Sequence, residues 1–200
     1  LGSGGLRLVN AAAALATAAV ITRALGAEGF GIYAIALSWV SILAIPSQLG
    51  LPTILVREAS EGSVSGEWGQ LRGLVHRSTQ FAVAVAAVSA AGLVVALWSG
   101  VVRLEPVMSL TLLAGAFFIP IVSLGALRSA LLRGLGRVTL GQLPDLIVRP
   151  VGFLALILLF LAAGLPLSPP TAMALHVGAA AAGFAIGAWL VWRSLPPTYY

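Results

Sequence analysis

The chain has few charged residues for its length. Of its 200 residues, 8% are charged and 60% are hydrophobic, whereas a soluble domain carries about 25% charged residues because water must wet its surface. The six acidic and eleven basic side chains cannot cover a water-facing domain of this size. These proportions exclude a soluble fold and indicate a protein that crosses a lipid bilayer several times.

Two residue types are missing altogether. Without cysteine, the chain has no disulfides, no thiol chemistry and no cysteine-ligated metal. All of the basic residues are arginine, so the lysine of a GxxxxGK[ST] phosphate loop is absent, and we expect no ATP-driven chemistry in this chain. Neither histidine stands at ligand spacing from an acid or from the other histidine, so we expect no metal site and no cofactor.

The uncharged stretches are long enough to cross a membrane as helices. A hydrocarbon core of about 30 Å requires about 20 apolar helical residues. The stretch 150–192 is long enough for two crossings and is divided by Gly164 and the three prolines that follow it. Long apolar runs also lack the alternation of barrel strands. The sequence therefore predicts an all-α, single membrane domain over residues 1–200, with six helices at about 6–25, 32–56, 78–99, 107–127, 143–164 and 171–192.

The arginines predict the orientation of these helices. If the N-terminus is cytoplasmic, the outer segments hold only Arg23 and Arg103. The inner segments then hold nine arginines, which are Arg7, Arg57, Arg72, Arg77, Arg128, Arg133, Arg137, Arg149 and Arg193. Positive residues accumulate on the cytoplasmic side of membrane proteins. The net charge of +5 is thus explained by topology with both termini cytoplasmic, and it gives no support for nucleic-acid binding.

Few residues suggest chemistry. Glu58, Glu61 and Glu67 share a polar inner segment, which we interpret as a solvated loop. Asp145 precedes Arg149 by four residues, so in an α-helix both side chains share one face and can pair. The pair is either an interfacial ion pair, or Arg149 faces a cavity and receives an anionic headgroup. His76 and His176 are expected to lie at the membrane interface.

Polar residues and helix breakers lie deeper in the predicted helices. Pro46 and Pro52 flank Gln48 in the second helix, and Pro120 interrupts the fourth. Proline frees backbone carbonyls, which neighbouring helices or a wet cavity must satisfy. Together with Asn10 in the first helix, these breaks favour a polar path through the interior. In the sixth helix, Gly183 and Gly187 form a GxxxG pair, which allows close packing against a helix of this bundle or of another chain.

One stretch resembles a known family. Arg23, Leu25, Gly26, Phe30, Gly31 and Tyr33 follow the pattern R-x-L-G-x-x-x-F-G-x-Y, and Gln48–Leu51 leads on to Arg57 and Glu58. This pattern resembles the N-terminal region of the polysaccharide biosynthesis proteins, the O-antigen and oligosaccharide flippases of the multidrug/oligosaccharidyl-lipid/polysaccharide exporter superfamily. The segment 127–137, followed by Pro144 and Arg149–Pro150, resembles their connection between the fourth and fifth helices. We expect Arg23, Gly26, Phe30, Gly31 and Tyr33 to position two helices.

The resemblance implies export of a lipid-linked sugar. Family members have twelve to fourteen helices in two lobes around a cationic cavity that opens alternately inward and outward. Their cargo is a polyprenyl-diphosphate-linked oligosaccharide for cell-envelope polysaccharides such as lipopolysaccharide, in the bacterial or archaeal plasma (inner) membrane. Six helices correspond to one lobe. The second lobe is then the missing half of a longer chain, as the absence of an initiator methionine favours, or it is a second chain.

The resemblance also suggests where the diphosphate binds. Arg7, Arg57 and Arg149 are predicted to flank the inner mouth, because guanidinium groups suit phosphate oxygens. Asn10 and Gln48 are predicted to hydrogen-bond to sugar hydroxyls or phosphate deeper in the bundle. The competing interpretation is that these arginines report membrane topology alone.

Three other functions remain open. A drug/cation antiporter of the same superfamily is expected to hold an acid in the interior of the lobe, and none of the six acids lies in the middle of a predicted helix. A membrane-embedded enzyme needs clustered carboxylates or histidines, and the segment with Glu58, Glu61 and Glu67 lacks a convincing motif. A structural subunit would pack through Gly183 and Gly187. We expect a transporter rather than an enzyme.

Overall fold

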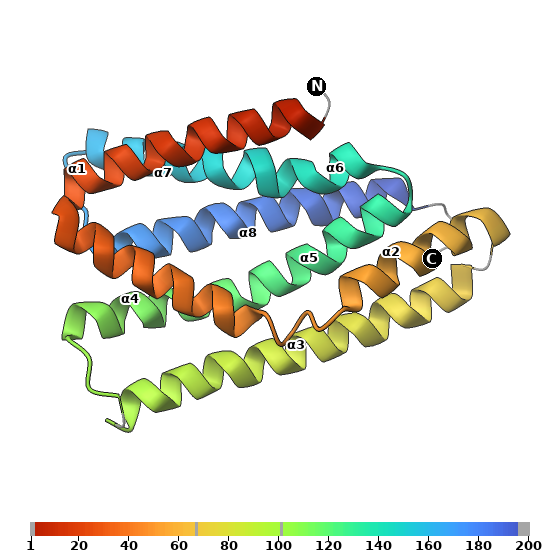
Figure 1. The fold of residues 1–200 in the computed structure, drawn as a ribbon, viewed down its shortest axis with the longest axis horizontal. Helices are drawn as coiled ribbons and strands as arrows, with labels where there is room; N and C mark the ends of the chain where they lie inside the picture. Colours follow the sequence, from red (N-terminus) through yellow and green to blue (C-terminus); the bar gives the residue numbers. More distant parts are fainter. Residues whose placement is uncertain (1–2, 67, 101, 196–200) are drawn as a thin grey trace.

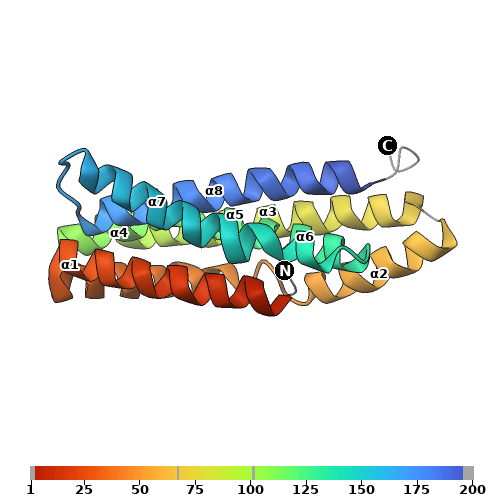
Figure 2. The ribbon, with the colours of Figure 1, turned by 90° about the horizontal axis from the view of Figure 1, so that it is seen from above.

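The computed structural model describes residues 3–66, 68–100 and 102–195. The structure is 87% helical, and its described part contains no strand. Five helical segments are long and apolar enough to cross a bilayer, and Figures 1 and 2 show them running along the long axis of the molecule. These segments are Gly4–Ala44, Trp68–Trp98, Pro106–Gly134, Val138–Ala162 and Pro169–Ser194. The predicted all-α membrane fold is confirmed.

The first segment, α1 (Ser3–Ala44), consists of two helices joined at a kink. Gly26 has φ 73° and ψ 175° there, a backbone conformation that is essentially restricted to glycine. The chain reverses direction at this residue, so residues 3–25 form a first arm and residues 27–44 form a second arm (Figure 1). The two arms account for the first predicted helix and for most of the second.

The second predicted helix is interrupted before its expected end. The second arm ends at Ala44, and residues 45–50 form turns that contain Pro46 and end at Gly50, whose φ is 79°. The predicted interruption by Pro46 is confirmed. Pro52 does not interrupt a helix but lies in the first turn of α2 (Leu51–Ser65), where the missing proline N–H leaves no helical hydrogen bond unmade.

The polar segment that follows is helical, which corrects the predicted loop. Glu58 and Glu61 lie on α2. α2 packs closely against α5, because a Cβ on Gly134 of α5 would lie 2.6 Å from both the Ala59 Cβ and the Val56 carbonyl oxygen. Polar residues were interpreted as loop because they lie beyond the membrane-crossing stretch, but a helix can continue into the interface. Glu67 lies outside the described residues.

The third and fourth crossings also extend past their predicted ends. α3 (Trp68–Trp98) begins ten residues before the predicted 78. The fourth crossing consists of α4 (Pro106–Ala116) and α5 (Phe118–Gly134), which are separated at Phe117. Because Pro120 has no N–H for the carbonyl of Ala116 and its ring crowds that carbonyl, the first helix ends there. The predicted break at Pro120 is confirmed.

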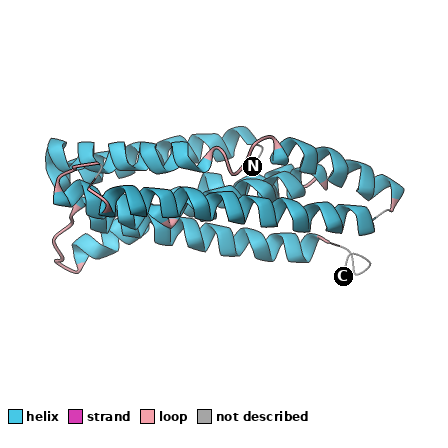
Figure 3. Cartoon of the chain, turned by 90° about the horizontal axis from the view of Figure 1, so that it is seen from below, coloured by secondary structure: helices cyan, strands magenta, loops and turns pink. Residues whose placement is uncertain are grey.

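The last two crossings meet at the proline-rich turn. α6 (Val138–Leu143), the π-helical turn η1 (Pro144–Val148) and α7 (Arg149–Ala162) form one crossing. α8 (Pro169–Ser194) forms the other, and the Oγ of its N-cap residue Ser168 accepts a hydrogen bond from the Thr171 N–H at 3.4 Å. Figure 3 shows the loops mainly at the two ends of the bundle, apart from the break before α2.

The core of the bundle combines alanines with large apolar and aromatic side chains, and many large apolar side chains also face outward. The largest core cluster joins both arms of α1 to α4, α5, α7 and α8, and it includes Ala36, Ala172, Ala179 and Ala180. Trp98, Leu15 and many other large apolar residues are exposed. Exposed apolar side chains and closely packed small residues are typical of helices that face lipid.

Candidate functional site

A pocket with both polar and apolar lining residues lies between the two arms of α1, α7 and α8, and it opens to the surroundings where the exposed residues Ala14 and Ser38 line it. Its volume is about 490 Å³, and we refer to it as the α1 pocket. The first arm lines it with residues up to Ile21, and the second arm lines it from Phe30 onward, so the reversal at Gly26 brings its two walls together. Its polar lining side chains are Asn10, Thr17, Tyr33, Ser38, Arg149 and His176. The remaining lining residues are apolar.

Aromatic packing fixes one side of the α1 pocket. The Tyr33 Oη and the His176 Nδ1 are joined by a hydrogen bond of 2.6 Å, although the two residues are 143 positions apart. The imidazole stacks on Phe153, with ring centroids 4.4 Å apart, and meets the edge of Phe118 at 5.1 Å. Only 5% of Tyr33 is exposed. Tyr33 and His176 therefore fill a space between helices.

Arg149 faces the α1 pocket without an acidic partner. Its guanidinium carbon lies 6.0 Å from the centroid of the Phe118 ring, within the range of a cation–π contact. In the described part of the chain, the ion pairs involve Arg57 and Arg128 and none includes Arg149. A positive charge at a pocket wall, beside the amide of Asn10, provides donors for an anionic or hydroxyl-rich ligand.

The predicted pairing of Asp145 with Arg149 is wrong. Asp145 lies in η1, and its Oδ2 is 3.4 Å from the Nη2 of Arg128 on α5. The spacing of four residues places two side chains on one face only in an α-helix. A π-helical turn contains more residues, so it rotates Asp145 away from Arg149 and toward α5.

Arg128 is the most deeply buried charged residue in the described part of the chain, with 7% of its surface exposed. Its Nη1 donates hydrogen bonds of 3.0 Å to the carbonyl oxygens of both Gly183 and Phe184 on α8. A Cβ on Gly187 would overlap the guanidinium, whereas the glycine leaves room for it. The GxxxG pair of α8 therefore packs within this chain, with Gly187 against an arginine and Gly183 against the Pro144 carbonyl of η1.

Sequence reasoning missed the role of Arg128. It counted this arginine as one of the inner topology residues, since a charge near the end of a helix is ordinarily interfacial. The available signal was the glycine pair on α8, because a space kept open inside a bundle must be filled by something. That pattern alone does not identify the side chain that fills it.

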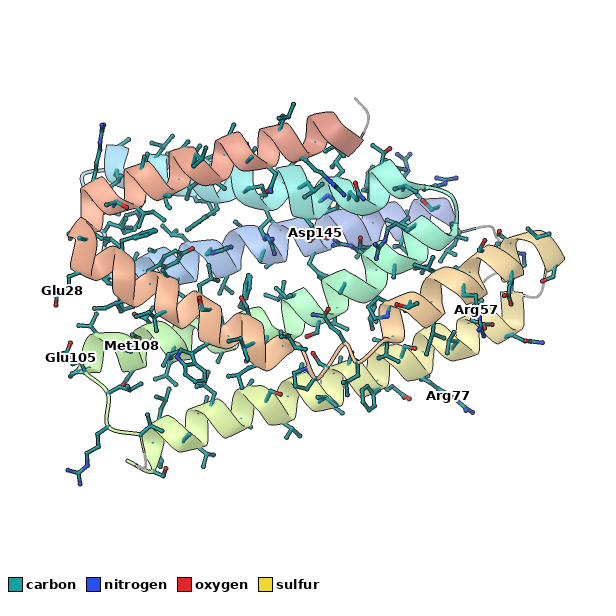
Figure 4. The ribbon with its side chains drawn as sticks, in the orientation of Figure 1. Glu28, Arg57, Arg77, Glu105, Met108 and Asp145 are labelled. Carbon is teal, nitrogen blue, oxygen red and sulfur yellow. The ribbon has the colours of Figure 1, made fainter. Side chains whose placement is uncertain are left out.

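The remaining predicted site residues lie apart from one another. Asn10 and Arg149 meet at the α1 pocket. Arg7 is exposed on the first arm, and Gln48 is half-buried in the turn before α2. Arg57 lies on α2 (Figure 4), where its Nη2 bonds to Glu58 at 2.8 Å and its Nε approaches Glu61 at 3.7 Å. The hydrogen bond that Arg57 donates to Glu58 raises the pKa of Arg57, so this side chain stays charged and already has partners.

The family-motif residues surround the reversal. Gly26 occupies the kink itself. Phe30 packs against the core cluster, with its ring centroid 6.4 Å from that of Tyr33. Arg23 is exposed at the end of the first arm, and Gly31 is half-buried with open space where a Cβ would stand. In this arrangement, Gly26 shapes the backbone and the two rings join the second arm to the core.

Comparison with known proteins identifies the family of this chain. No curated protein and no solved structure matches the chain significantly. A family model, described as polysaccharide biosynthesis protein, matches residues 4–199 and thus covers both arms of α1, the α1 pocket and the Arg128 contacts. The chain belongs to the polysaccharide biosynthesis protein family.

Proposed function

We propose that this chain forms one lobe of a transporter that flips a lipid-linked oligosaccharide across a bacterial or archaeal plasma membrane by alternating access. The cargo is a polyprenyl-diphosphate-linked oligosaccharide for cell-surface polysaccharide. A second six-helix lobe, from a longer chain or from a second chain, supplies the opposite wall. Both termini lie in the cytoplasm, and the protein moves its cargo without chemical change. Membership of the polysaccharide biosynthesis family supports this assignment.

The observation that carries the proposal is the placement of Arg149. Topology explains an arginine at a membrane surface, but it gives no reason for an arginine to line a pocket between helices without an ion-pair partner among the described residues. Ionisable groups within membrane bundles ordinarily mark a transport path or a ligand site. The guanidinium offers paired N–H donors to phosphate oxygens, and Asn10 adds both a donor and an acceptor.

Substitution of Arg149 tests this role. In the full-length protein, we expect Arg149→Gln to lower export of the lipid-linked oligosaccharide at least about tenfold, because a hydrogen bond to a charged group contributes about 1.5–3 kcal/mol. Arg149→Lys keeps the charge but loses the planar fork, so its export should be intermediate. The measurement is surface polysaccharide, together with the lipid-linked precursor retained in the cells, at matched levels of membrane protein.

The matched control is Arg103→Gln, which removes an exposed arginine from the segment between α3 and α4. Normal export in this variant would show that the loss of one positive charge is harmless in itself. Normal export in both Arg149→Gln and Asn10→Ala would contradict ligand binding in the α1 pocket. Arg7→Gln and Arg57→Gln extend the same assay to the predicted inner mouth.

A further inference from the structure

A second groove, which shares no lining residue with the α1 pocket, lies beside α3, α5 and α8. Its deeper part is a cavity of about 220 Å³ with mainly apolar walls. Leu127 and Leu131 of α5 and Val191 of α8 contribute to these walls, as does Leu55 of α2. Arg128 is its only charged lining residue.

The groove widens along the first turns of α3. An open cavity of about 650 Å³ is lined there by Gly69, Arg72, Gly73 and His76. Val75 and Thr79 line both cavities, so the two adjoin along α3. We call the two cavities together the α3 groove. A Cβ on Gly69 or Gly73 would meet nothing within 4 Å, so the two glycines leave this mouth open.

The polarity of the α3 groove changes along its length. The mouth is lined by Arg72 and by His76, whose Nε2 lies 2.9 Å from the Gln80 Nε2, at the polar start of a crossing whose later residues are almost all apolar. The deeper part is a channel of leucine and valine side chains. A cationic mouth that leads into an apolar channel, on a bundle that faces lipid, matches an amphiphile with an acidic headgroup.

We propose that the α3 groove binds one anionic phospholipid from the leaflet that meets the start of α3. The phosphate lies between Arg72 and His76, and an acyl chain passes Thr79 into the channel between α5 and α8. On the orientation proposed above, this is the cytoplasmic leaflet.

The buried arginine gives the channel a charge preference. The Nε of Arg128 is buried without a hydrogen-bond partner, and its single carboxylate contact is the 3.4 Å approach to Asp145, whose side chain is 41% exposed. The positive charge behind the channel is thus only partly balanced within the described residues. A net negative ligand at the mouth offsets this field, whereas a zwitterionic headgroup does so less effectively.

The groove is distinct from the proposed cargo path, and its lipid is a resident molecule of the bilayer. The two sites share no residue, so loss of phospholipid binding and loss of export are separate outcomes. Polyprenyl diphosphate combines the same chemistry and is the competing occupant, which a displacement experiment distinguishes.

The experiment counts phosphatidylglycerol molecules retained by the purified full-length protein, using native mass spectrometry. We expect one retained phosphatidylglycerol, little retention of phosphatidylcholine with the same acyl chains, and no retention of glycerol phosphate, which has no acyl chain. Arg72→Gln should weaken this binding at least about tenfold, because it removes a charged hydrogen-bond donor. The control Arg77→Gln removes an exposed arginine that does not line the groove, and it should change binding less than about twofold.

A variant that fills the groove provides a second, independent test of the proposal. Gly73→Leu adds a side chain at the open mouth and also favours the helix, so the variant should fold. It should block retention of phosphatidylglycerol while leaving Arg72 in place. Equal losses of phosphatidylglycerol binding in Arg72→Gln and Arg77→Gln would show that the lipid is held by general surface charge. Unchanged binding in Gly73→Leu would show that the lipid does not bind in the groove. Displacement of phosphatidylglycerol by equimolar polyprenyl diphosphate would identify the groove as a cargo site and overturn the proposal.

Discussion

At the scale of single residues, the Arg128 guanidinium occupies the space that the absence of a side chain at Gly187 leaves open. Burying a charge without partners is costly. Here the charge is shared among two α8 carbonyl oxygens, the Asp145 carboxylate and the face of the Phe184 ring, whose centroid lies 5.7 Å from the guanidinium carbon. These contacts require the guanidinium to lie against the α8 backbone, which only a glycine at position 187 permits.

Gly187→Ala should therefore destabilise the protein by about 1–3 kcal/mol, the usual cost of overpacking. The added Cβ would displace the guanidinium from its carbonyl partners, because the two groups cannot occupy the same space. Thermal unfolding in detergent or nanodiscs measures the loss. The control is Gly178→Ala on the same helix, where a Cβ meets nothing within 4 Å and helix propensity improves. Equal stability of the two variants would contradict the packing of Arg128 against Gly187.

At the scale of helices, each interruption of a crossing has a local cause. The reversal in α1 coincides with the unusual backbone of Gly26, the break between α4 and α5 lies three residues before Pro120, and the π-helical turn begins at Pro144. Two of these interruptions determine which residues meet at a pocket or an ion pair. The reversal brings together two walls of the α1 pocket, and the π-helical turn directs Asp145 toward Arg128.

Gly26→Ala tests the reversal. Its φ and ψ lie in a region where a Cβ clashes with the backbone, so the variant should lose about 1–3 kcal/mol of stability. Because the two arms also line the α1 pocket, export should fall with stability. Gly31→Ala is the matched control five residues later, since that glycine lies in a regular part of the helix with open space around its Cβ position. Comparable unfolding temperatures for the two variants would contradict a special role for Gly26.

The sequence predicted the crossings better than it predicted their ends or their contacts. Apolar length is a local property, so the membrane segments could be recognised directly, and Gly26 and Pro120 are local signals as well. Helix ends beyond the bilayer have no hydrophobic signal, which is why the sequence does not predict the later part of α2 or the start of α3 as helix. Of the proposed ligand residues, only Asn10 and Arg149 share a pocket, because spacing along the chain gives no information about contacts between distant helices.

At the scale of the whole molecule, the arginines are distributed unevenly along the bundle, with Arg23 and Arg103 toward one end and more of them toward the other. Figure 4 shows Glu28 and Glu105 at one end, while Arg57 lies near the opposite end. The turns at the first end were predicted to be external and α2 was predicted to be cytoplasmic. Excess arginine at the α2 end favours its retention on the cytoplasmic side.

The absence of native cysteine allows a direct test of this orientation. Ser63→Cys on α2 and Ser99→Cys just after α3 place single thiols at exposed positions on opposite ends of the molecule. In intact cells, a membrane-impermeant maleimide should label Ser99→Cys and should reach Ser63→Cys only after permeabilisation. The reverse pattern would contradict cytoplasmic placement of α2.

The contacts of Arg128 also have a consequence for the order in which the protein assembles. The carbonyl groups that receive this guanidinium lie 55 and 56 residues further along the chain, on α8, which is synthesised after α5 and α7. Until α8 inserts, Arg128 has only the 3.4 Å contact with Asp145 among these partners, and a charged residue within a membrane helix costs up to about 3 kcal/mol. α5 can therefore settle at its final depth only when α8 arrives, so nascent chains halted before α8 should remain exposed to quality-control proteases.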